Sequence, residues 1–578
     1  MNVRFGSKAV GRRSSNVRFG PIADFNDSFS MGRLSGAFGT IAEAARPARL
    51  AARDDCLSGH RLGGLVGDLL KIVCFLPIVS ALLLGSGFDE AGLGAGMTAI
   101  VKEELLDDRL AKLETARTWS PRLVSRLESH VRSADDEALF RINPITFARE
   151  RSLKEDEVID LLLYATSLGL FGMDWLLLCP KCSCVVESLR HLEGVHRHYH
   201  CPACQVDLEA SLDDQIAITF TISPQIRAIA FHRPDQLSAH DYCFKYGATR
   251  DGVLPDGRPF VDVKIALTKA VSYLPPGETT RMAIEASEGS IFGTSPEGKA
   301  SLLFSIEGAP SATDQVAHVL FEKQVLEHVP GCVAPGAITF EVKNATAERG
   351  TFCLAVLPPG TKVGQAPIKF LPFLTGKRLL TTQAFRDLFR SEVIRSSEGI
   401  GVKDITLLFT DVKGSTALYD RIGDLNAFAL VQRHFERLQD IATRFRGAII
   451  KTIGDAVMAA FLNPSDAVSA ALAMRADIAE FNDGQPDRQL ILKIGIHKGA
   501  AIAVTLNERL DYFGQTVNIA ARVQHLAGAD EIYVSEDAYD DAVRAILERF
   551  KVDSKVAKLR GIQQDQRIFC VATLTEAG

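Results

Sequence analysis

Two acidic positions in the C-terminal third of the chain have the surroundings of metal-binding carboxylates. The first lies in DITLLFTDVKGST, residues 404–416, where an apolar, β-branched segment predicts a buried strand that ends at Asp411. A carboxylate there can bind a hard cation, and a helix opening after the turn Gly414, Ser415, Thr416 would offer backbone N–H groups to phosphate oxygens. Because an Asp after a strand is also a frequent helix cap, the interpretation needs a second acidic residue.

The second acidic position lies in AIIKTIGDAVMAAF, residues 448–461. Two apolar segments flank Gly454 and Asp455, a pattern that predicts a β-hairpin with the acidic residue at its tip. If this hairpin lies beside the strand that ends at Asp411, the two carboxylates can share two divalent ions about 4 Å apart. Such ions polarise an attacking oxygen and steady phosphate groups, so the pattern predicts chemistry at a phosphate.

A third motif, LDYFGQTVNIAARV, places Asp511 before a predicted helix that carries Asn518 and Arg522. Side chains four residues apart project from one face of a helix on successive turns. An amide one turn from a cation suits a ribose and a charged transition state. Taken alone, the spacing equally fits Arg522 as a surface cation.

The segment between the first two motifs, NAFALVQRHFERLQDIATRFRG, predicts an amphipathic helix that Gly447 ends. Its apolar side chains recur at helical spacing, so we expect them in a hydrophobic core. They are Phe428, Val431, Phe435, Leu438, Ala442 and Phe445.

Four motifs in order, FTDVKGST, IIKTIGDAVMAAF, LKIGIHKGAA and DYFGQTVNIAARV, resemble the catalytic domain of class III nucleotide cyclases. The resemblance covers about residues 404–571, under a third of the chain. It implies a ferredoxin-like α/β catalytic domain at the C-terminus of a multidomain α+β protein of a bacterial type. The front of such a chain is expected to be a regulatory region with an unknown ligand or protein partner.

The resemblance also implies a role for each matching residue. Asp411 and Asp455 correspond to the metal-binding aspartates, with the carbonyl of Val412 as a further ligand of two Mg²⁺ or Mn²⁺ ions. Lys451 and Asp511 correspond to the residues that select adenine, where guanylate cyclases usually carry Glu and Cys. ATP is therefore the favoured substrate.

The remaining implied roles concern the sugar and the phosphates. Asn518 matches the ribose-orienting asparagine and Arg522 the transition-state arginine. Gly414, Ser415 and Thr416 are expected to contact the nucleotide. Arg560 stands where the family often has a phosphate-binding lysine, a departure that keeps the positive charge.

The implied reaction is attack of the ATP ribose 3′-hydroxyl on the α-phosphate, which yields cyclic AMP and pyrophosphate. In this family the domain works as an antiparallel dimer whose metal aspartates come from one subunit and whose other site residues come from the second. Because the chain carries each of these groups once, a homodimer with two equivalent sites is expected.

A second constellation lies upstream, in CPKCSCVVESLRHLEGVHRHYHCPAC. Two CxxC pairs with this separation predict a closed tetrahedral site for a structural Zn²⁺. The ligands would be Cys179, Cys182, Cys201 and Cys204. His198 or His200 could replace one cysteine, and four reduced thiols without metal are the alternative.

Patterns in the rest of the chain suggest its domains. Residues 101–178 read as helices ending in a strand, a winged-helix-like layout, and 376–400 as a linker with an amphipathic helix over 381–394. The segments QIAITFTIS, FVDVKIALT, GAITFEVKN and GTFCLAVL alternate polar and apolar residues and predict a β-sandwich. The expected domains are 1–96, a disordered or mis-annotated extension with Met97 as the authentic start; 97–178, winged-helix-like; 179–212, zinc ribbon; 213–375, β-sandwich; 376–400, linker; and 401–575, catalytic.

Composition narrows the function classes. A net charge of −6 over 578 residues gives no basic surplus for a nucleic-acid partner. Eleven cysteines with two CxxC pairs fit a reducing compartment, so a cytoplasmic location is expected. The apolar run 72–85, within residues 62–86, is short for a membrane span. The alternatives are a catalytically weak nucleotide-binding scaffold, a guanylate cyclase, and a transcription regulator, which the missing basic recognition helix disfavours.

Overall fold

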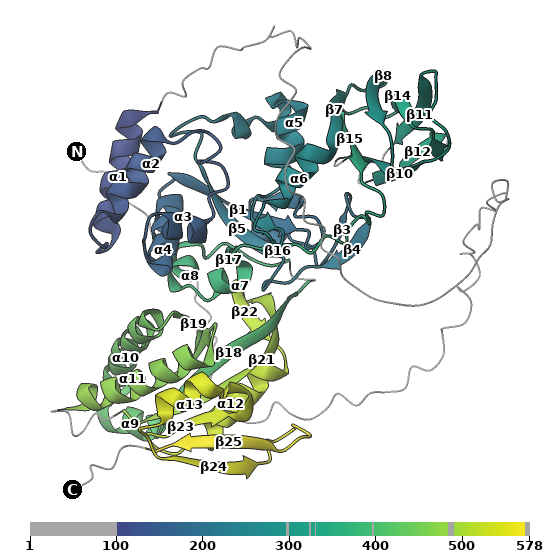
Figure 1. The fold of residues 1–578 in the computed structure, drawn as a ribbon. Helices are drawn as coiled ribbons and strands as arrows, with labels where there is room; N and C mark the ends of the chain where they lie inside the picture. The colour runs from purple at the N-terminus through teal and green to yellow at the C-terminus, as the bar shows by residue number, and fades with distance from the viewer. Residues whose placement is uncertain are drawn as a thin grey trace, which may run out of the picture. The chain divides into compact units, whose positions relative to one another are not determined.

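The computed structural model describes most of the chain after residue 100 (Figure 1). The described ranges are 101–295, 297, 300–322, 325–329, 331–395, 398–483 and 490–572. The predicted extension 1–96, the apolar run 72–85 and Met97 lie outside them. Within these ranges, no helix has the length and apolar character needed to cross a bilayer.

The first described region packs four helices against a four-stranded sheet of order β17-β5-β1-β2. Leucines at helical spacing in the helices and a strand buried along nearly its whole length form one core. The helices are α1 (Glu103–Ala116), α2 (Leu123–Ser133), α3 (Pro144–Glu150) and α4 (Glu155–Ser167). The strands are β1 (Phe171–Leu178), β2 (Val185–Leu189), β5 (Ile216–Ile222) and β17 (Leu374–Thr375).

This sheet crosses the predicted domain boundaries. β5 pairs with β1 over its whole length, and β17 pairs with β5, although both lie in the segment 213–375 that we expected to form a separate sandwich. The pairing of strands far apart in the chain is set by tertiary packing, which alternation along one segment does not reveal.

The strands between Thr268 and Leu357 form two further sheets, of order β13-β10-β9-β15-β7 and β12-β11-β14-β8. Their inward side chains alternate with exposed ones and meet in one hydrophobic cluster. The strands are β7 (Thr268–Leu274), β8 (Thr279–Ala286), β9 (Ser290–Ser295), β10 (Ala300–Ile306), β11 (Gln315–Glu322), β12 (Val325–Val329), β13 (Cys332–Val333), β14 (Gly336–Asn344) and β15 (Gly350–Leu357).

The predicted strand FVDVKIALT is wrong. Residues Phe260–Leu267 form helix α6. The sequence fits both periods, but Val261 and Ile265, four apart, pack together against Phe244 and Ala248. This tertiary contact selects the helix. The short elements between β5 and β7 are η2 (Ala230–His232), η3 (Pro234–Gln236), α5 (Ala239–Asp241), the π-helix η4 (Tyr242–Tyr246) and β6 (Gly252–Val253), which pairs with β16 (Lys369–Phe370).

Two short helices connect this front region to the C-terminal domain. They are α7 (Gly376–Leu380) and α8 (Gln383–Leu388), so the amphipathic helix predicted over 381–394 is present only in part. Phe385 on α8 is fully buried and stacks edge-on against Trp175 of β1, with ring centroids 6.1 Å apart. The connection is therefore packed into the core of the front region.

The C-terminal domain has an eight-stranded mixed sheet in its described part, of order β19-β20-β18-β21-β23-β25-β24 with β22 paired to β21 (Figure 1). Helices α10, α11 and α13 share one hydrophobic cluster with the sheet. Helix α12 packs into a different cluster, which also contains residues of β18, β21 and β22 and continues into the core of the front region. The strands are β18 (Ile400–Val412), β19 (Gly447–Ile453), β20 (Ala456–Phe461), β21 (Leu492–Leu506), β22 (Arg509–Phe513), β23 (Ile532–Ser535), β24 (Val552–Ala557) and β25 (Gln566–Val571). The helices are α9 (Ser415–Ile422), α10 (Asp424–Arg444), α11 (Pro464–Asn482), α12 (Gln515–Leu526), η6 (Glu536–Ala538) and α13 (Asp541–Leu547).

Helix α10 confirms most of the predicted amphipathic helix, but it ends at Arg444, before Phe445, and Gly447 begins β19. Val431, Leu438 and Ala442 are buried as expected, but Phe428 is 58% exposed. At about 100° per residue, Phe428 projects about 100° away from the middle of the buried stripe. Its neighbour Leu425 is 85% exposed, so the first turns of α10 present apolar side chains to solvent.

Candidate functional site

The two aspartates of the predicted metal site lie at the same end of neighbouring strands. β18 pairs antiparallel with β20 up to Thr410 opposite Val457, and Asp411 follows directly. β19 and β20 form the predicted hairpin, with Gly454 at a φ of 64° and Asp455 in the turn. The register thus sets Asp411 beside the turn that holds Asp455, as the metal-site prediction requires.

The surroundings of Asp455 fit a cation. Its Oδ2 atom is buried and has no hydrogen-bond partner among the described residues. A carboxylate oxygen taken from water without a partner is costly, and a bound divalent ion removes that cost. The fields of Asp455 and Asp424 add to burial in raising the pKa of Tyr419 on α9, which places α9 close to this carboxylate.

A lysine that the sequence analysis missed contacts Asp411. Lys493 on β21 lies opposite Asp411, and its Nζ is 3.6 Å from the Asp411 Oδ2. Its side chain is only 17% exposed, so the cation is held at the acidic site. The signal was present in the motif LKIGIHKGAA, whose first lysine pairs across the sheet with the aspartate of FTDVKGST.

The helix after the first motif begins as predicted. Gly414 adopts the left-handed conformation, with a φ of 74°, and helix α9 starts at Ser415. The N-cap residue Gly414 has no side chain that could cap this N-terminus. Its first backbone N–H groups therefore remain available to an anion at the strand end that carries Asp411.

The two residues expected to select the base contact each other directly. Lys451 Nζ on β19 lies 2.6 Å from Asp511 Oδ2 on β22. The other oxygen of Asp511 accepts a hydrogen bond from the Tyr512 backbone N at 2.7 Å, and the residue is 6% exposed. The ammonium group of Lys451 and the carboxylate of Asp511 are thus held in one orientation, although the two residues lie sixty positions apart in the sequence.

The remaining predicted residues lie on α12 and the loop before β25. Asn518 is exposed and Arg522 is half-buried on α12, while Arg560 is exposed. Arg522 lies against the loop of Arg560, since a Cβ placed on Gly561 would be 3.5 Å from its Nη2. Neither guanidinium has an ion-pair partner within the described ranges, so both charges are free to meet an anion.

A buried histidine in the same domain is unsuited to proton transfer. His497 on β21 is 3% exposed, and its Nδ1 lies 2.8 Å from Ser535 Oγ. Burial lowers its pKa to about 4, an effect that Asp537 only partly opposes. His497 is therefore a neutral core residue at physiological pH.

The site residues fall into two separate groups within the chain. One group holds Asp411, Asp455 and Lys493; the other holds the Lys451–Asp511 pair with Asn518, Arg522 and Arg560. No hydrogen bond or ion pair joins the two groups in the part of the chain that the structure describes. Each group is half of the site that the sequence predicts.

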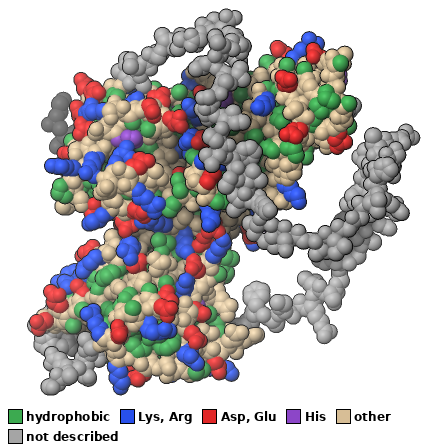
Figure 2. Space-filling model, in the orientation of Figure 1, with side chains coloured by type: hydrophobic (Ala, Val, Ile, Leu, Met, Phe, Trp, Pro, Cys, Tyr) green, Lys and Arg blue, Asp and Glu red, His purple; other side chains and the backbone are tan. Residues whose placement is uncertain are grey.

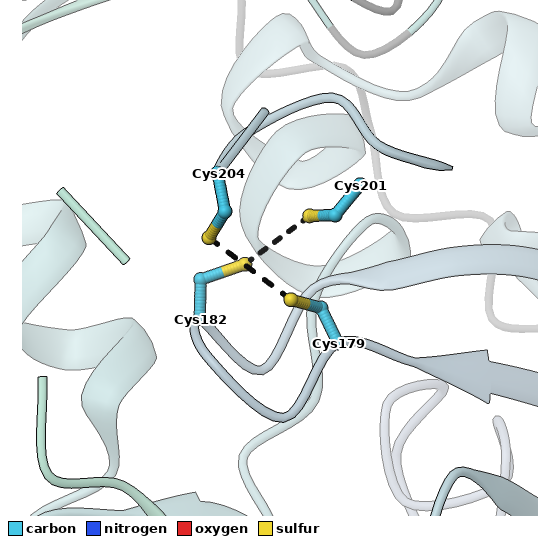
Figure 3. Close-up of side chains that lie close together, drawn as sticks. All are labelled: Cys179, Cys182, Cys201 and Cys204. Carbon is cyan, nitrogen blue, oxygen red and sulfur yellow. Dashed lines mark hydrogen bonds between the residues drawn. The ribbon is translucent and has the colours of Figure 1, made fainter. Parts of the chain in front are cut away.

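The four cysteines of the upstream motif converge from two loops (Figure 3). Their Sγ atoms all lie within 4.8 Å of one another, with Cys182 to Cys201 at 3.6 Å and Cys179 to Cys204 at 4.0 Å. A tetrahedral zinc with Zn–S bonds of about 2.3 Å requires S···S separations of about 3.8 Å, so the spacing fits. His200 contacts Asp207 instead, with Nδ1 2.9 Å from Oδ1.

The pKa values of these thiols depend on one another. Hydrogen bonds from Cys182, Cys201 and Cys204 hold the pKa of the Cys179 thiol far below its usual range. The hydrogen bond to Cys179 raises the pKa values of Cys201 and Cys204. One thiolate is thus stabilised by neutral neighbours, and four thiolates together need a positive ion. The loops are held by η1 (Leu192–Gly194) and the hairpin of β3 (His198–Cys201) and β4 (Val206–Glu209).

Comparison with known families agrees with the C-terminal site. Residues 400–571 match the family described as adenylate and guanylate cyclase catalytic domain. The C-terminal domain is therefore a class III adenylate/guanylate cyclase catalytic domain, a class that generally uses divalent Mg²⁺ or Mn²⁺. Residues 106–387 match a family of unknown function (DUF5939).

Individual relatives are similar over part of the chain. An adenylate cyclase of Anabaena cylindrica is 30% identical over 137 residues, which are 21% of this chain and 27% of that protein. A pH-sensitive adenylate cyclase of Mycobacterium tuberculosis is 27% identical over 254 residues, 40% of this chain and 61% of that protein. The crystal structure of the adenylyl cyclase CyaB from P. aeruginosa shares 24% identity over 30% of this chain and 96% of its own, with a TM-score of 0.27. The chain spans 29%, 8% and 6% of three further curated relatives.

Proposed function

We propose that the protein is an adenylate cyclase that converts ATP to 3′,5′-cyclic AMP and pyrophosphate in composite sites of a homodimer. The observation that carries the choice of ATP is the contact of 2.6 Å between Lys451 Nζ and Asp511 Oδ2. Lysine only donates hydrogen bonds and an ionised carboxylate only accepts them. The adenine edge offers an acceptor at N1 and a donor at N6, whereas guanine reverses both.

The chemistry follows from the other residues. The ribose 3′-oxygen bonds to the α-phosphorus, the bond from that phosphorus to the bridging oxygen breaks, pyrophosphate leaves, and the hydroxyl proton is released. Asp411, Asp455 and the Val412 carbonyl would hold two divalent ions, which polarise the attacking oxygen and neutralise phosphate charge when bound. Lys493 and the free N-terminus of α9 add positive potential for the phosphates.

The second group of residues would act on the same nucleotide from the partner chain. Asn518 would orient the ribose, and Arg522 would neutralise charge that develops on the transferred phosphate. Arg560, beside Arg522, would bind the outer phosphates. Because no described residue is assigned as a general base here, the rate enhancement would come mainly from positioning and electrostatics.

Exposed apolar side chains support the homodimer. Leu425 and Phe428 on α10 and Ile453 before the Asp455 turn border one half-site, and Phe513 borders Asp511 in the other. Their exposed fractions are 85%, 58%, 50% and 62%, respectively. A second copy that brings the two half-sites together would bury these side chains.

We propose that the front region regulates this activity through its contacts with the start of β18. The backbone N of Lys403 in β18 donates to Asp213 Oδ2 at 2.7 Å, and Lys377 Nζ lies 3.0 Å from Asp213 Oδ1. Lys377 also pairs with Asp404 at the start of the first motif. On the visible face of the described residues, Lys and Arg side chains are interspersed with Asp and Glu (Figure 2).

Exchange of the base-contacting pair tests the substrate assignment. The double variant Lys451→Glu, Asp511→Cys presents an acceptor and a weak donor, the reverse of the native pair. We expect kcat/KM for ATP to fall by about 10³-fold, and kcat/KM for GTP to become larger than kcat/KM for ATP. The reason is that a site strongly rejects a base that leaves the polar groups of the site unpaired. Both products are measured chromatographically. Unchanged ATP preference in a folded double variant would contradict the assignment.

We further propose that the four cysteines bind one structural Zn²⁺, because their thiols have tetrahedral spacing. A closed site of four thiolates contributes about 10 kcal/mol of binding linked to folding. Metal analysis of the purified protein is expected to find about one zinc per chain, and none in Cys201→Ser, which should also melt at lower temperature. Cys332→Ser is the control, since Cys332 is exposed and outside the cluster. A wild-type protein that is purified without metal and melts at the same temperature as Cys201→Ser would exclude the zinc site.

A further inference from the structure

Helix α8 contacts both strands that carry the Lys451–Asp511 pair. Gln383 Oε1 accepts a hydrogen bond from the Ile449 backbone N on β19 at 2.8 Å. Arg386 Nη1 and Nη2 donate to the Leu510 carbonyl oxygen on β22 at 2.9 and 3.1 Å. Ile449 lies two residues before Lys451, and Leu510 directly precedes Asp511. Helix α8 thus holds the backbone close to Lys451 on β19 and the backbone next to Asp511 on β22.

The contact of Gln383 is fixed and satisfies a backbone donor on an edge strand. Its Nε2 donates to Asp387 Oδ1 at 3.0 Å, which orients the amide so that the oxygen faces Ile449. β19 is the edge strand of its sheet and has a bulge between Ile449 and Lys451. An edge-strand N–H that is buried must find a partner outside the ladder. Gln383, only 7% exposed, is that partner.

Arg386 is a buried cation with backbone partners. Its Nε donates to the Leu380 carbonyl at 3.1 Å, so all its hydrogen bonds in the described ranges go to carbonyl oxygens. Burial lowers the pKa of Arg386, and the charges of Tyr512 and Asp511 oppose that shift. Holding a guanidinium in such surroundings is costly, but it fixes the position of β22 beside Asp511.

The same helix is bound to the front region. Phe385 of α8 packs against Trp175 of β1, and Arg378 of the preceding helix α7 contacts α4. Arg378 Nη1 lies 2.8 Å from Glu155 Oε2, and its Nη2 lies 2.7 Å from Asp156 Oδ1. A displacement of α4 would therefore reach β19 and β22 through α7 and α8.

We propose that Gln383 and Arg386 are positioning residues for base recognition: they fix β19 and β22 so that Lys451 Nζ and Asp511 Oδ2 keep the spacing that a purine edge requires. Neither side chain needs to touch the nucleotide. The inference rests on the proposed function, because it assigns the 2.6 Å pair to the base. It also makes α8 the route by which the front region alters substrate affinity.

The test compares Gln383→Met and Arg386→Met, two replacements of similar length without the polar heads. We expect KM for ATP to rise about tenfold while kcat changes less than about threefold, the pattern of lost binding rather than lost chemistry. The preference for ATP over GTP should fall in parallel. Arg386→Lys, which keeps a donor for Leu510, should recover part of the affinity.

A binding measurement separates this inference from the proposed function. The probe is α,β-methylene-ATP, whose α–β bridge cannot break to release pyrophosphate, and its Kd should rise about tenfold in both methionine variants. If the wild type binds the probe but forms no cyclic AMP, the proposed function fails while the binding shift still tests α8.

A matched control variant separates positioning from stability. Arg475→Met removes another arginine whose pKa burial lowers and whose Nη1 donates to a backbone carbonyl, that of Val571 at 2.9 Å. We expect it to lower the melting temperature without changing KM or Kd. If the Gln383 and Arg386 variants also lose only melting temperature, the positioning role is overturned.

Discussion

The Asp455→Asn variant is expected to lose cyclic AMP formation by about 10³-fold, because it removes a charged ligand from the proposed two-metal site. That factor corresponds to about 4 kcal/mol of transition-state stabilisation, the scale of a metal ion's contribution. The fold should be preserved. Asp455 Oδ2 is buried without a partner, so a neutral side chain of the same shape removes an unfavourable charge. We therefore expect an unchanged or higher melting temperature together with the loss of activity.

The control for this variant is Asp420→Asn, on the neighbouring helix α9. Asp420 is exposed and belongs to neither half-site. Its replacement should leave cyclic AMP formation and melting temperature near those of the wild type. An Asp455→Asn protein that keeps more than half of the wild-type rate at saturating Mg²⁺ would exclude Asp455 as a metal ligand.

The second large effect is rescue between two inactive chains. Asp411→Ala and Arg522→Ala are each expected to abolish activity as homodimers. In a heterodimer of the two, one site combines both lesions, whereas the other receives intact Asp411 from one chain and intact Arg522 from its partner. Heterodimers isolated through two different tags should therefore show about half of the wild-type specific activity.

The matched control for the rescue pairs Asp411→Ala with Asp455→Ala. These residues belong to the same half-site, so every site of that heterodimer lacks one metal ligand and activity should stay absent. Absence of rescue in the first pair, with the heterodimer confirmed by its mass, would rule out shared sites. Rescue in the control pair would equally contradict the arrangement.

Sequence reasoning predicted the strand end at Asp411 and the hairpin turn at Asp455 because their signals are local. A strand that ends at Asp411 and a hairpin with Asp455 at its tip are set by alternation and turn chemistry within a few residues. The contact of Lys451 with Asp511 was not readable in that way, since β22 belongs to a hairpin that follows sixty residues later. Only the resemblance carried by the four ordered motifs indicated that Lys451 and Asp511 act together.

The wrong predictions and the overlooked residues have a common physical cause. Phe260–Leu267 fits both a strand and a helix period, and packing against Phe244 decides for the helix. β5 was assigned to the wrong sheet because strand pairing is set by tertiary contacts. Lys493 and Arg386 gained their significance from partners across the sheet and across the domain connection. Each feature depends on residues distant in the chain, where single-segment patterns carry no information.

The most direct test of the central claim is product analysis of the purified wild-type protein supplied with ATP or GTP and Mg²⁺ or Mn²⁺. The account predicts cyclic AMP and pyrophosphate in equal amounts from ATP, and much less cyclic GMP from GTP. A folded, dimeric protein that forms neither cyclic nucleotide, or that forms cyclic GMP faster than cyclic AMP, would contradict it.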